Sequence, residues 1–351
     1  MKSKSRLFSL VIFIFIVLLL ANPSANACSR VLYHGLEGTV ITGRTMDWTE
    51  DIGTNLWIFP RGMEREGRVG PNSYKWTSKY GSVIASAYDM STADGMNEEG
   101  LVTNVLWLAE SVYPKWDGQK PGLSLALWAQ YVLDSFATVK EAVEALSREE
   151  FVLITADMPG RDNLATVHLA VSDSLGDSAI FEYVDGELVI HHDSSYLVMT
   201  NSPTYQQQLA LNEYWKEIGG MVVLPGTSRA ADRFARAWFY INAIPKTADI
   251  QIAVASVFSV IRNVSVPFGI STPEKPNIST TRWRTVIDHK NKVYYFESTL
   301  TPNLFWVQLD KIDFSPSAPV QKLVISPEHF YAGDTAQLFV ETKPFEFMGL
   351  E

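Results

Sequence analysis

The sequence has little cysteine and few basic residues, and each shortage excludes a class of protein. Its one cysteine, Cys28, cannot form an internal disulfide, so stability must come from a core, which 46% apolar residues in 351 can build. Acidic residues outnumber basic ones by 39 to 29, and the net charge of −10 repels nucleic acid and anionic membranes. With no repeat and no low-complexity linker, we expect one domain.

Several catalytic and nucleotide-binding motifs are also absent. The sequence has no G-x-S-x-G, H-E-x-x-H or P-loop, and no G-x-G-x-x-G between a strand and a helix. The only histidine pair, His191-His192, lies in an expected strand, where adjacent side chains face opposite sides and cannot hold one metal together. We therefore expect neither a metal nor a cofactor.

The first residues have the three parts of a secretory signal, in order. The basic start consists of Lys2, Lys4 and Arg6, the apolar run covers 7–20, and Ala25-Asn26-Ala27 is the expected cleavage site. About 14 apolar residues are few for a membrane anchor, which needs roughly 20. A lipoprotein signal, the other alternative, usually has a large aliphatic residue where Ala25 stands. We expect a periplasmic or secreted protein of residues 28–351, whose net charge is −13 because residues 1–27 hold three basic and no acidic groups.

Apolar periodicity predicts blocks of strands and blocks of helices. Strands are expected over 29–33, 39–44, 55–59, 165–171, 179–183, 187–191, 196–200, 282–288, 292–298 and 304–310. Helices are expected over 123–133, 139–146, 203–218, 231–241 and 250–261. Turn residues predict hairpins at 185–186 and 290–291. Such blocks are typical of an α+β domain in which helices cover sheets.

Cleavage after Ala27 would place a thiol and an α-amine on one residue, Cys28. The thiolate is the attacking form, and an α-amine with a pKa near 7.7–8.0 can accept the thiol proton and return it to a leaving group. Cys28 is therefore predicted to be a nucleophile with its own base. The alternative, a buried inert thiol, fits poorly because a chain terminus is seldom the centre of a core.

Four other residues are candidates for the groups that Cys28 lacks: a cation, a group that orients the amine, and oxyanion donors. Arg44 and Asp47 stand at the end of a strand expected to pair with the Cys28 strand, although a surface ion pair is equally consistent. Asn201 ends a strand before a helix and either faces a cleft or caps that helix. Arg233 opens a helix, where a solvated arginine is the plainer interpretation.

Six ordered motifs resemble the choloylglycine hydrolase family of N-terminal nucleophile hydrolases, which includes penicillin V acylases and bile salt hydrolases. The motifs are Cys28, Arg44-x-x-Asp47, Asp94-Gly95-Met96-Asn97-Glu98-x-Gly100-Leu101, Thr200-Asn201-Ser202-Pro203, Leu224-Pro225-Gly226 and Arg233-Phe234. The resemblance extends from Cys28 to about Asp310. It implies a four-layer αββα sandwich in one domain, and hydrolysis of a linear amide through an acyl-enzyme without a cofactor.

The resemblance also implies roles for the candidates. Cys28 would be nucleophile and base, with Arg44 beside the thiol and Asp47 holding the α-amine. Asn201 would donate to the oxyanion, and Arg233 would support the site.

Two departures from the family pattern bear on substrate and assembly. Trp107 stands where bile salt hydrolases have Asn and typical penicillin V acylases Tyr, so only its backbone N–H can complete the oxyanion hole. Only 23 residues separate Asn201 from Pro225, where Gram-positive members insert a tetramer-building loop. The short connection resembles the Gram-negative branch and leaves a homotetramer open.

The resemblance to the Gram-negative branch implies cleavage of penicillin V and, as in some members, of N-acyl homoserine lactones. Trp48 and Trp107 are expected to flank the cleft, where indoles suit a phenoxyacetyl ring or acyl chain, although ordinary core aromatics are the alternative interpretation of both. The expected partner is thus a small-molecule acyl amide. The alternatives are a bile salt hydrolase and, more remotely, a non-catalytic envelope binding protein.

Overall fold

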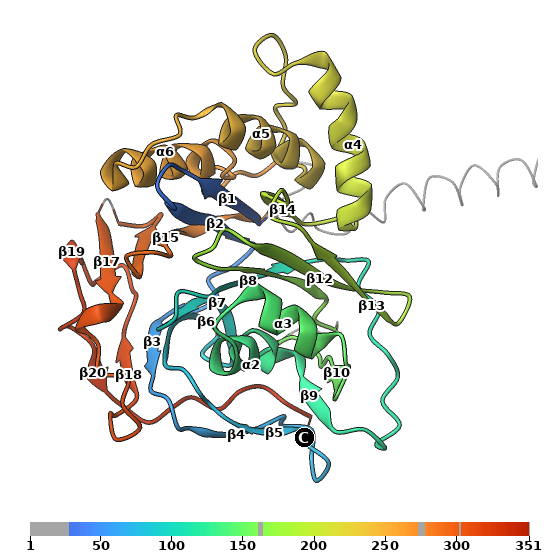
Figure 1. The fold of residues 1–351 in the computed structure, drawn as a ribbon, viewed down its shortest axis with the longest axis vertical. Helices are drawn as coiled ribbons and strands as arrows, with labels where there is room; N and C mark the ends of the chain where they lie inside the picture. The colour runs from blue at the N-terminus through green and yellow to red at the C-terminus, as the bar shows by residue number, and fades with distance from the viewer. Residues whose placement is uncertain (1–27, 161–163, 273–277, 302, 351) are drawn as a thin grey trace, which may run out of the picture.

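The computed structural model describes residues 28–350 except 161–163, 273–277 and 302. Two large sheets lie face to face, and helices cover both outer faces in the order α–β–β–α (Figure 1). The expected α+β fold is therefore confirmed. The expected leader, residues 1–27, and its cleavage site lie outside the described residues.

The first sheet has seven strands and carries the N-terminal part of the described chain. Its order is β14 (Val198–Thr200), β1 (Ser29–His34), β2 (Val40–Trp48), β15 (Thr280–Asp288), β16 (Val293–Ser298), β17 (Leu304–Gln308) and β19 (Gly333–Asp334). Helices α5 (Ala230–Ala243) and α6 (Ile250–Asn263) cover its outer face, and α4 (Tyr205–Ile218) packs against α5 (Figure 1).

The second sheet has nine strands. Its order is β13 (Glu187–His192), β12 (Ser178–Val184), β11 (Val167–Ser172), β8 (Val102–Trp107), β7 (Ser91–Asn97), β6 (Ser82–Ala87), β3 (Leu56–Phe59), β18 (Gln321–Leu323) and β20 (Val340–Glu341). Helices α2 (Trp128–Ser135) and α3 (Val139–Leu146) contact its outer face. The remaining short elements are β4 (Glu64–Glu66), β5 (Lys75–Thr77), β9 (Gly122–Ser124), β10 (Val152–Ile154), η1 (Leu125–Leu127) and η2 (Leu309–Lys311).

The elements predicted from periodicity are largely confirmed, and α3 has the predicted bounds with Thr138 as its cap. The helix expected over 123–133 is wrong at its start, because 122–124 form β9 and the α-helix begins only at Trp128. Strands β6, β7 and β8 were missed although they lie in the middle of their sheet. β7 contains Asp94 and Gly95, residue types that are rare in strands, and is held there by burial between layers.

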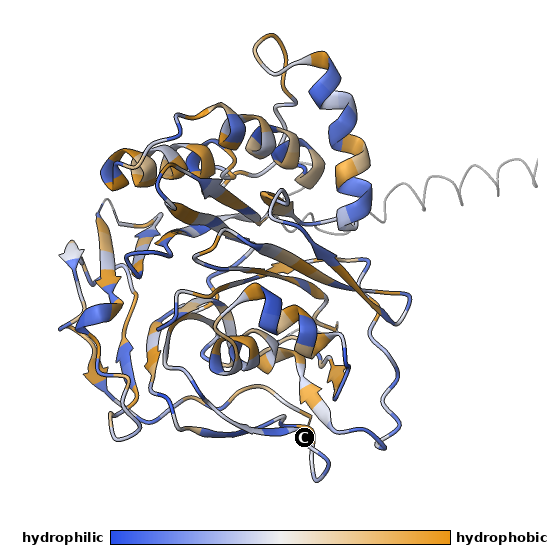
Figure 2. Ribbon diagram, in the orientation of Figure 1, coloured by the Kyte–Doolittle hydropathy of each residue, from blue (hydrophilic) through white to orange (hydrophobic). Residues whose placement is uncertain are grey.

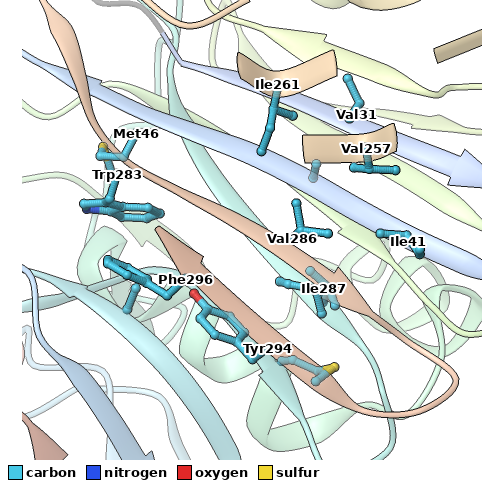
Figure 3. Packing of buried hydrophobic residues seen from close by; sticks show 14 of the residues in the cluster. Val31, Ile41, Met46, Val257, Ile261, Trp283, Val286, Ile287, Tyr294 and Phe296 are labelled. Atoms are coloured by element: carbon cyan, nitrogen blue, oxygen red, sulfur yellow. The ribbon is translucent and has the colours of Figure 1, made fainter. Parts of the chain in front are cut away.

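Strand β2 is buried at all nine positions because helices lie on one face and the second sheet on the other. On the helix side, a Cβ at Gly43 would lie 2.7 Å from Val257 and 2.9 Å from Ile261, so α6 can approach this closely only over a glycine. Figure 3 shows Val257 and Ile261 beside Val31 on this face.

The facing sides of the sheets form an aromatic core. Trp283 and Phe296, labelled in Figure 3, have ring centroids 5.3 Å apart. Polar residues gather on the outside, most clearly on α3 and along much of α4 (Figure 2). Within the described ranges, no helix has the length and hydrophobicity that crossing a membrane requires.

Candidate active site

Cys28 immediately precedes β1 and is buried, with 3% of its surface exposed. Because Ser29 pairs with Thr45 in the antiparallel register, Cys28 lies beside the end of β2. The backbone N–H of Asp47 donates to Cys28 Sγ at 3.5 Å, and the sulfur of Met46 lies 3.9 Å from Sγ. The thiol therefore meets a backbone donor and a polarisable sulfur from β2.

Arg44 and Asp47 are three residues apart on one strand, so their side chains leave β2 on opposite faces. Arg44 points toward the second sheet, where Nη1 donates to Ala93 O at 2.8 Å and Nη2 donates to Val105 O at 2.7 Å. Nη2 also lies 3.7 Å from Met46 Sδ. Met46 thus lies between the guanidinium and the thiol, and Arg44 acts on Cys28 through space.

Asp47 accepts hydrogen bonds from two hydroxyls, Thr45 Oγ1 at 3.1 Å and Thr281 Oγ1 at 2.5 Å. Cys28 N is a peptide nitrogen in the full chain, and it donates to Asn201 Oδ1. The expectation that Asp47 holds the α-amine therefore stays a prediction for the cleaved protein.

Asn201 and Arg233 bring the second half of the chain to Cys28. Arg233 is fully buried at the start of α5, which makes the solvated-arginine interpretation wrong. Its Nη1 donates to Cys28 O at 2.5 Å, and its Nη2 donates to Asn201 Oδ1 at 3.0 Å. Asn201 does not cap α4, whose N-cap is Thr204. The amide is held from both sides, because Asn201 Nδ2 donates to Trp107 O at 2.7 Å.

That last contact also orients the backbone of Trp107. In an antiparallel strand the N–H and C=O of one residue point to the same side, so the Trp107 N–H shares the side on which its carbonyl meets Asn201. One hydrogen of Asn201 Nδ2 is used by this contact, and the amide has a second. The expectation that these two N–H groups donate to an oxyanion stays a prediction.

Burial dominates the electrostatics of the site. It raises the pKa of the Cys28 thiol, and the positive charge of Arg44 opposes that rise. Burial also raises the pKa of Asp47, to about 6, against the opposing charge of Arg233 and the hydroxyl donors. The ionisation of Cys28 and Asp47 thus depends on the two buried arginines, Arg44 and Arg233.

The thiol opens into a cavity of about 130 Å³ that also opens to solvent. Trp48 and Trp107 both line it, with ring centroids 5.6 Å apart and planes inclined at 54°. The rest of the lining is mainly aliphatic or methionine: Met46, Ile52, Ala87, Met90, Ala93, Val105, Leu106, Leu125, Ala126, Met158, Pro159, Ala165, Val167 and Met348. The cavity therefore offers apolar contacts to a group attached to the reacting carbonyl.

Three residues that hold the site, Met46, Asp94 and Tyr294, are not among the site residues predicted from the sequence. Met46 shares the face of Arg44 and Trp48, which period-two alternation could have shown. Asp94 lies 3.5 Å from Arg44 Nη1 and accepts a hydrogen bond from Tyr294 at 2.5 Å, all three side chains being buried. The motif that begins at Asp94 indicates the family, but its spacing does not predict the contact of the Asp94 carboxylate with Arg44.

His191 and His192 contact different carboxylates, as their opposite faces on β13 predict. His191 Nε2 lies 3.4 Å from Glu182, and His192 Nε2 lies 2.8 Å from Asp177. Among the described residues, no group of three or more His, Cys, Asp or Glu side chains is arranged to hold a metal ion.

Residues 28–322 match the family described as linear amide C–N hydrolases, choloylglycine hydrolase family. The chain belongs to this family. Penicillin V acylase of Pectobacterium atrosepticum is 52% identical over 99% of this chain and all of its own length. The solved penicillin V acylase of Agrobacterium tumefaciens is 61% identical with a TM-score of 0.87, covering 92% of this chain and 100% of that one. The chain is thus a linear amide C–N hydrolase similar to penicillin V acylase, with an N-terminal nucleophile hydrolase fold.

More distant members share the fold. A solved conjugated bile acid hydrolase of Clostridium perfringens has 23% identity and a TM-score of 0.72 over 86% of this chain and 97% of that one. The family match begins at Cys28, the residue around which the site is built.

Asp47→Asn is expected to stabilise the unprocessed chain at neutral pH. The folded pKa of Asp47, about 6, exceeds its ordinary 3.8, so its contribution to stability is fully present below 3.8 and is lost as the pH rises through 6. A neutral amide avoids the cost of burying the ionised group, which we expect to be roughly 1–3 kcal/mol. Urea unfolding at pH 8 and pH 4 measures it. The free energy of unfolding of the variant should exceed that of the parent at pH 8 but not at pH 4. The control Asp310→Asn, at an exposed side chain, should change it at neither pH.

Proposed function

We propose that this hydrolase cleaves amides whose acyl group is aromatic or a long apolar chain, with penicillin V as a substrate. The observation that carries this proposal is the apolar lining of the cavity that opens onto the Cys28 thiol, made of Trp48, Trp107 and mainly aliphatic side chains. A phenoxyacetyl ring or an alkyl chain gains from such contacts, whereas a charged or hydroxylated group would lose its hydration there. Two relatives that are 52% and 61% identical are penicillin V acylases.

The reaction requires removal of residues 1–27, which we propose occurs on export to the periplasm or medium. Lys2, Lys4 and Arg6, the apolar run over 7–20 and Ala25-Asn26-Ala27 support this step, as does the start of the family match at Cys28. Cleavage would replace the Cys28 peptide nitrogen with an α-amine on the same residue as the thiol.

In the proposed first half-reaction, the α-amine takes the thiol proton and Cys28 Sγ attacks the carbonyl carbon. The negative oxygen that forms receives hydrogen bonds from Asn201 Nδ2 and the Trp107 N–H. The C–N bond breaks, the α-ammonium returns the proton to the leaving nitrogen, and a thioester remains on Cys28.

In the second half-reaction, the α-amine takes a proton from water as the water attacks the thioester carbonyl. The C–S bond breaks, the acyl acid leaves, and the proton returns to the thiolate. In this scheme Arg44 stabilises the thiolate and Asp47 the α-ammonium, while Arg233 holds Asn201 and the Cys28 carbonyl in place.

The same chemistry applies to N-acyl homoserine lactones, because their acyl chain and scissile amide meet the same cavity and thiol. We therefore propose acyl homoserine lactone hydrolysis as a second activity of this site. Because each methylene contributes about 1 kcal/mol in an apolar pocket, preference among chains should be graded.

Steady-state hydrolysis of penicillin V, decanoyl homoserine lactone and glycocholate tests the proposal. We expect kcat/KM for the first two to exceed that for glycocholate by about 100-fold, because the cavity offers the sterol hydroxyls few partners. Intact mass of the exported protein checks in parallel that the chain starts at Cys28. Preferred hydrolysis of glycocholate would assign a bile salt hydrolase instead, and a leader or lipid still on Cys28 would exclude the mechanism.

A further inference from the structure

The last described residues, which follow β20, form a C-terminal segment over 342–350 that lies outside the family match at 28–322. In Figure 1 this segment crosses the lower part of the molecule and ends near β5, well away from β1 and β2. Met348 in this segment nevertheless lines the same cavity as Cys28.

Aromatic side chains fix the C-terminal segment to the second sheet. The ring of Phe345 lies 5.0 Å from that of Trp57 in an edge contact, and Phe347 is buried with its ring 6.3 Å from Phe59. Arg65 lies over Phe347 at 5.3 Å. The segment is thus packed as part of the core that lies on the outer side of this sheet.

Hydrogen bonds fix the backbone of Met348 on both sides. Its N–H donates to Met90 O at 2.9 Å, and Ser124 Oγ donates to its carbonyl oxygen at 2.6 Å. A Cβ on the next residue, Gly349, would lie 2.0 Å from Arg68 O, so the chain passes here in a contact that only glycine allows. Met348 therefore has a fixed position.

The direction of the Met348 side chain follows from its neighbour. In an extended chain adjacent side chains point to opposite sides. Phe347 points into the core around Phe59, so Met348 points away from that core, into the cavity that it lines.

Strand β7 relates Met348 to the thiol. Ala93 O accepts the hydrogen bond from Arg44 beside Cys28, and Met90, which holds Met348, lies three residues earlier on the chain. Met90 lies in the turn just before β7, and Ala93 lies farther along that strand. Met348 therefore lines the cavity near the start of β7, whereas Arg44 approaches the strand at Ala93.

We propose that Met348 ends the acyl cavity and sets the longest acyl chain that the enzyme accepts efficiently. The inference rests on the proposed acyl amide hydrolysis and assigns its length limit to this residue. A fixed backbone with a flexible thioether produces a firm but adjustable end, because methionine adapts its shape to its contacts.

The test compares the Met348→Trp and Met348→Ala variants with the unsubstituted enzyme, each processed to begin at Cys28. The substrates are acyl homoserine lactones of about 6 and about 12 acyl carbons, one short and one long chain. The measured quantity is the ratio of kcat/KM for dodecanoyl over hexanoyl substrate. We expect the larger side chain to lower the ratio about tenfold and the smaller one to raise it about fivefold. Lys343→Ala, at an exposed position of the same segment, should leave the ratio unchanged.

A ratio of two rates on one preparation cancels the fraction of folded enzyme, so partial misfolding cannot imitate the effect. If the ratios of both variants stayed within about twofold of the ratio of the unsubstituted enzyme, the assignment of Met348 would be wrong. The proposed amide hydrolysis would be unaffected by that result. If the unsubstituted enzyme released no acyl acid from any of these amides or from penicillin V, the proposed function itself would be wrong, and this inference with it.

Discussion

Cys28→Ser is expected to lower kcat/KM for penicillin V by about 1000-fold or more. A serine hydroxyl ionises at far higher pH than a thiol, so at neutral pH far less of it is in the attacking anionic form. Met46, whose sulfur lies 3.9 Å from Cys28 Sγ, is a thioether and cannot replace the thiol as a nucleophile. Removing a nucleophile that acts together with its base typically costs several orders of magnitude in kcat.

The measurement is steady-state release of phenoxyacetic acid by variant and parent, each confirmed by intact mass to begin at residue 28. Cys28→Ala provides the second variant, since it removes the nucleophile without adding a hydroxyl. Equal thermal unfolding midpoints would show that the fold is retained. Turnover equal to that of the parent would refute the thiol mechanism, whereas loss in both variants would support it.

Arg44→Met is expected to change both the thiol and the stability of the fold. The positive charge of Arg44 opposes the rise that burial causes in the Cys28 pKa, so its removal should move the pH midpoint of thiol alkylation upward. The same substitution leaves Asp94 buried without its guanidinium partner, and breaking a buried pair costs about 3–5 kcal/mol. The two effects have different sources.

A double variant, Arg44→Met with Asp94→Asn, separates them. Neutralising the carboxylate should restore much of the stability, because no unpaired buried charge remains, while the alkylation midpoint should stay high. Arg61→Met is the matched control: its partner is Glu98, the arginine side chain is 42% exposed, and such pairs contribute at most about 1 kcal/mol. If the pH midpoint of thiol alkylation were unchanged in Arg44→Met, Arg44 would have no influence on the pKa of the Cys28 thiol.

The contacts of Arg44 give a structural role to Asp94, a residue of the family motifs that lies away from the nucleophile. Asp94 stands 50 residues from Arg44 and lies on the other sheet. The two side chains, with Tyr294, connect the facing sheets, and Arg44 reaches the sulfur of Met46 beside the thiol. A change at Asp94 should therefore affect the site through Arg44, even though Asp94 does not line the cavity.

The sequence by itself determined the features that depend on neighbouring residues. Apolar spacing and turn residues predicted every strand of the first sheet except β19, the strands β3, β11, β12 and β13 of the second, and the helices. The position of Cys28 after Ala25-Asn26-Ala27 indicated its chemistry. Local patterns suffice here because periodicity, caps and signal segments are properties of short stretches. The six ordered motifs also indicated the choloylglycine hydrolase family.

Only the tertiary structure decided which of these residues meet. Arg233 reaches the Cys28 carbonyl from 205 positions away, and Met348 enters the cavity from a segment with no recognisable motif. Strand β7 escaped detection because burial between the layers, which no local pattern encodes, overrides its weak strand propensity. Contacts between distant segments depend on how the layers stack, and so the limits of the cavity and the partner of each buried charge follow from the fold as a whole.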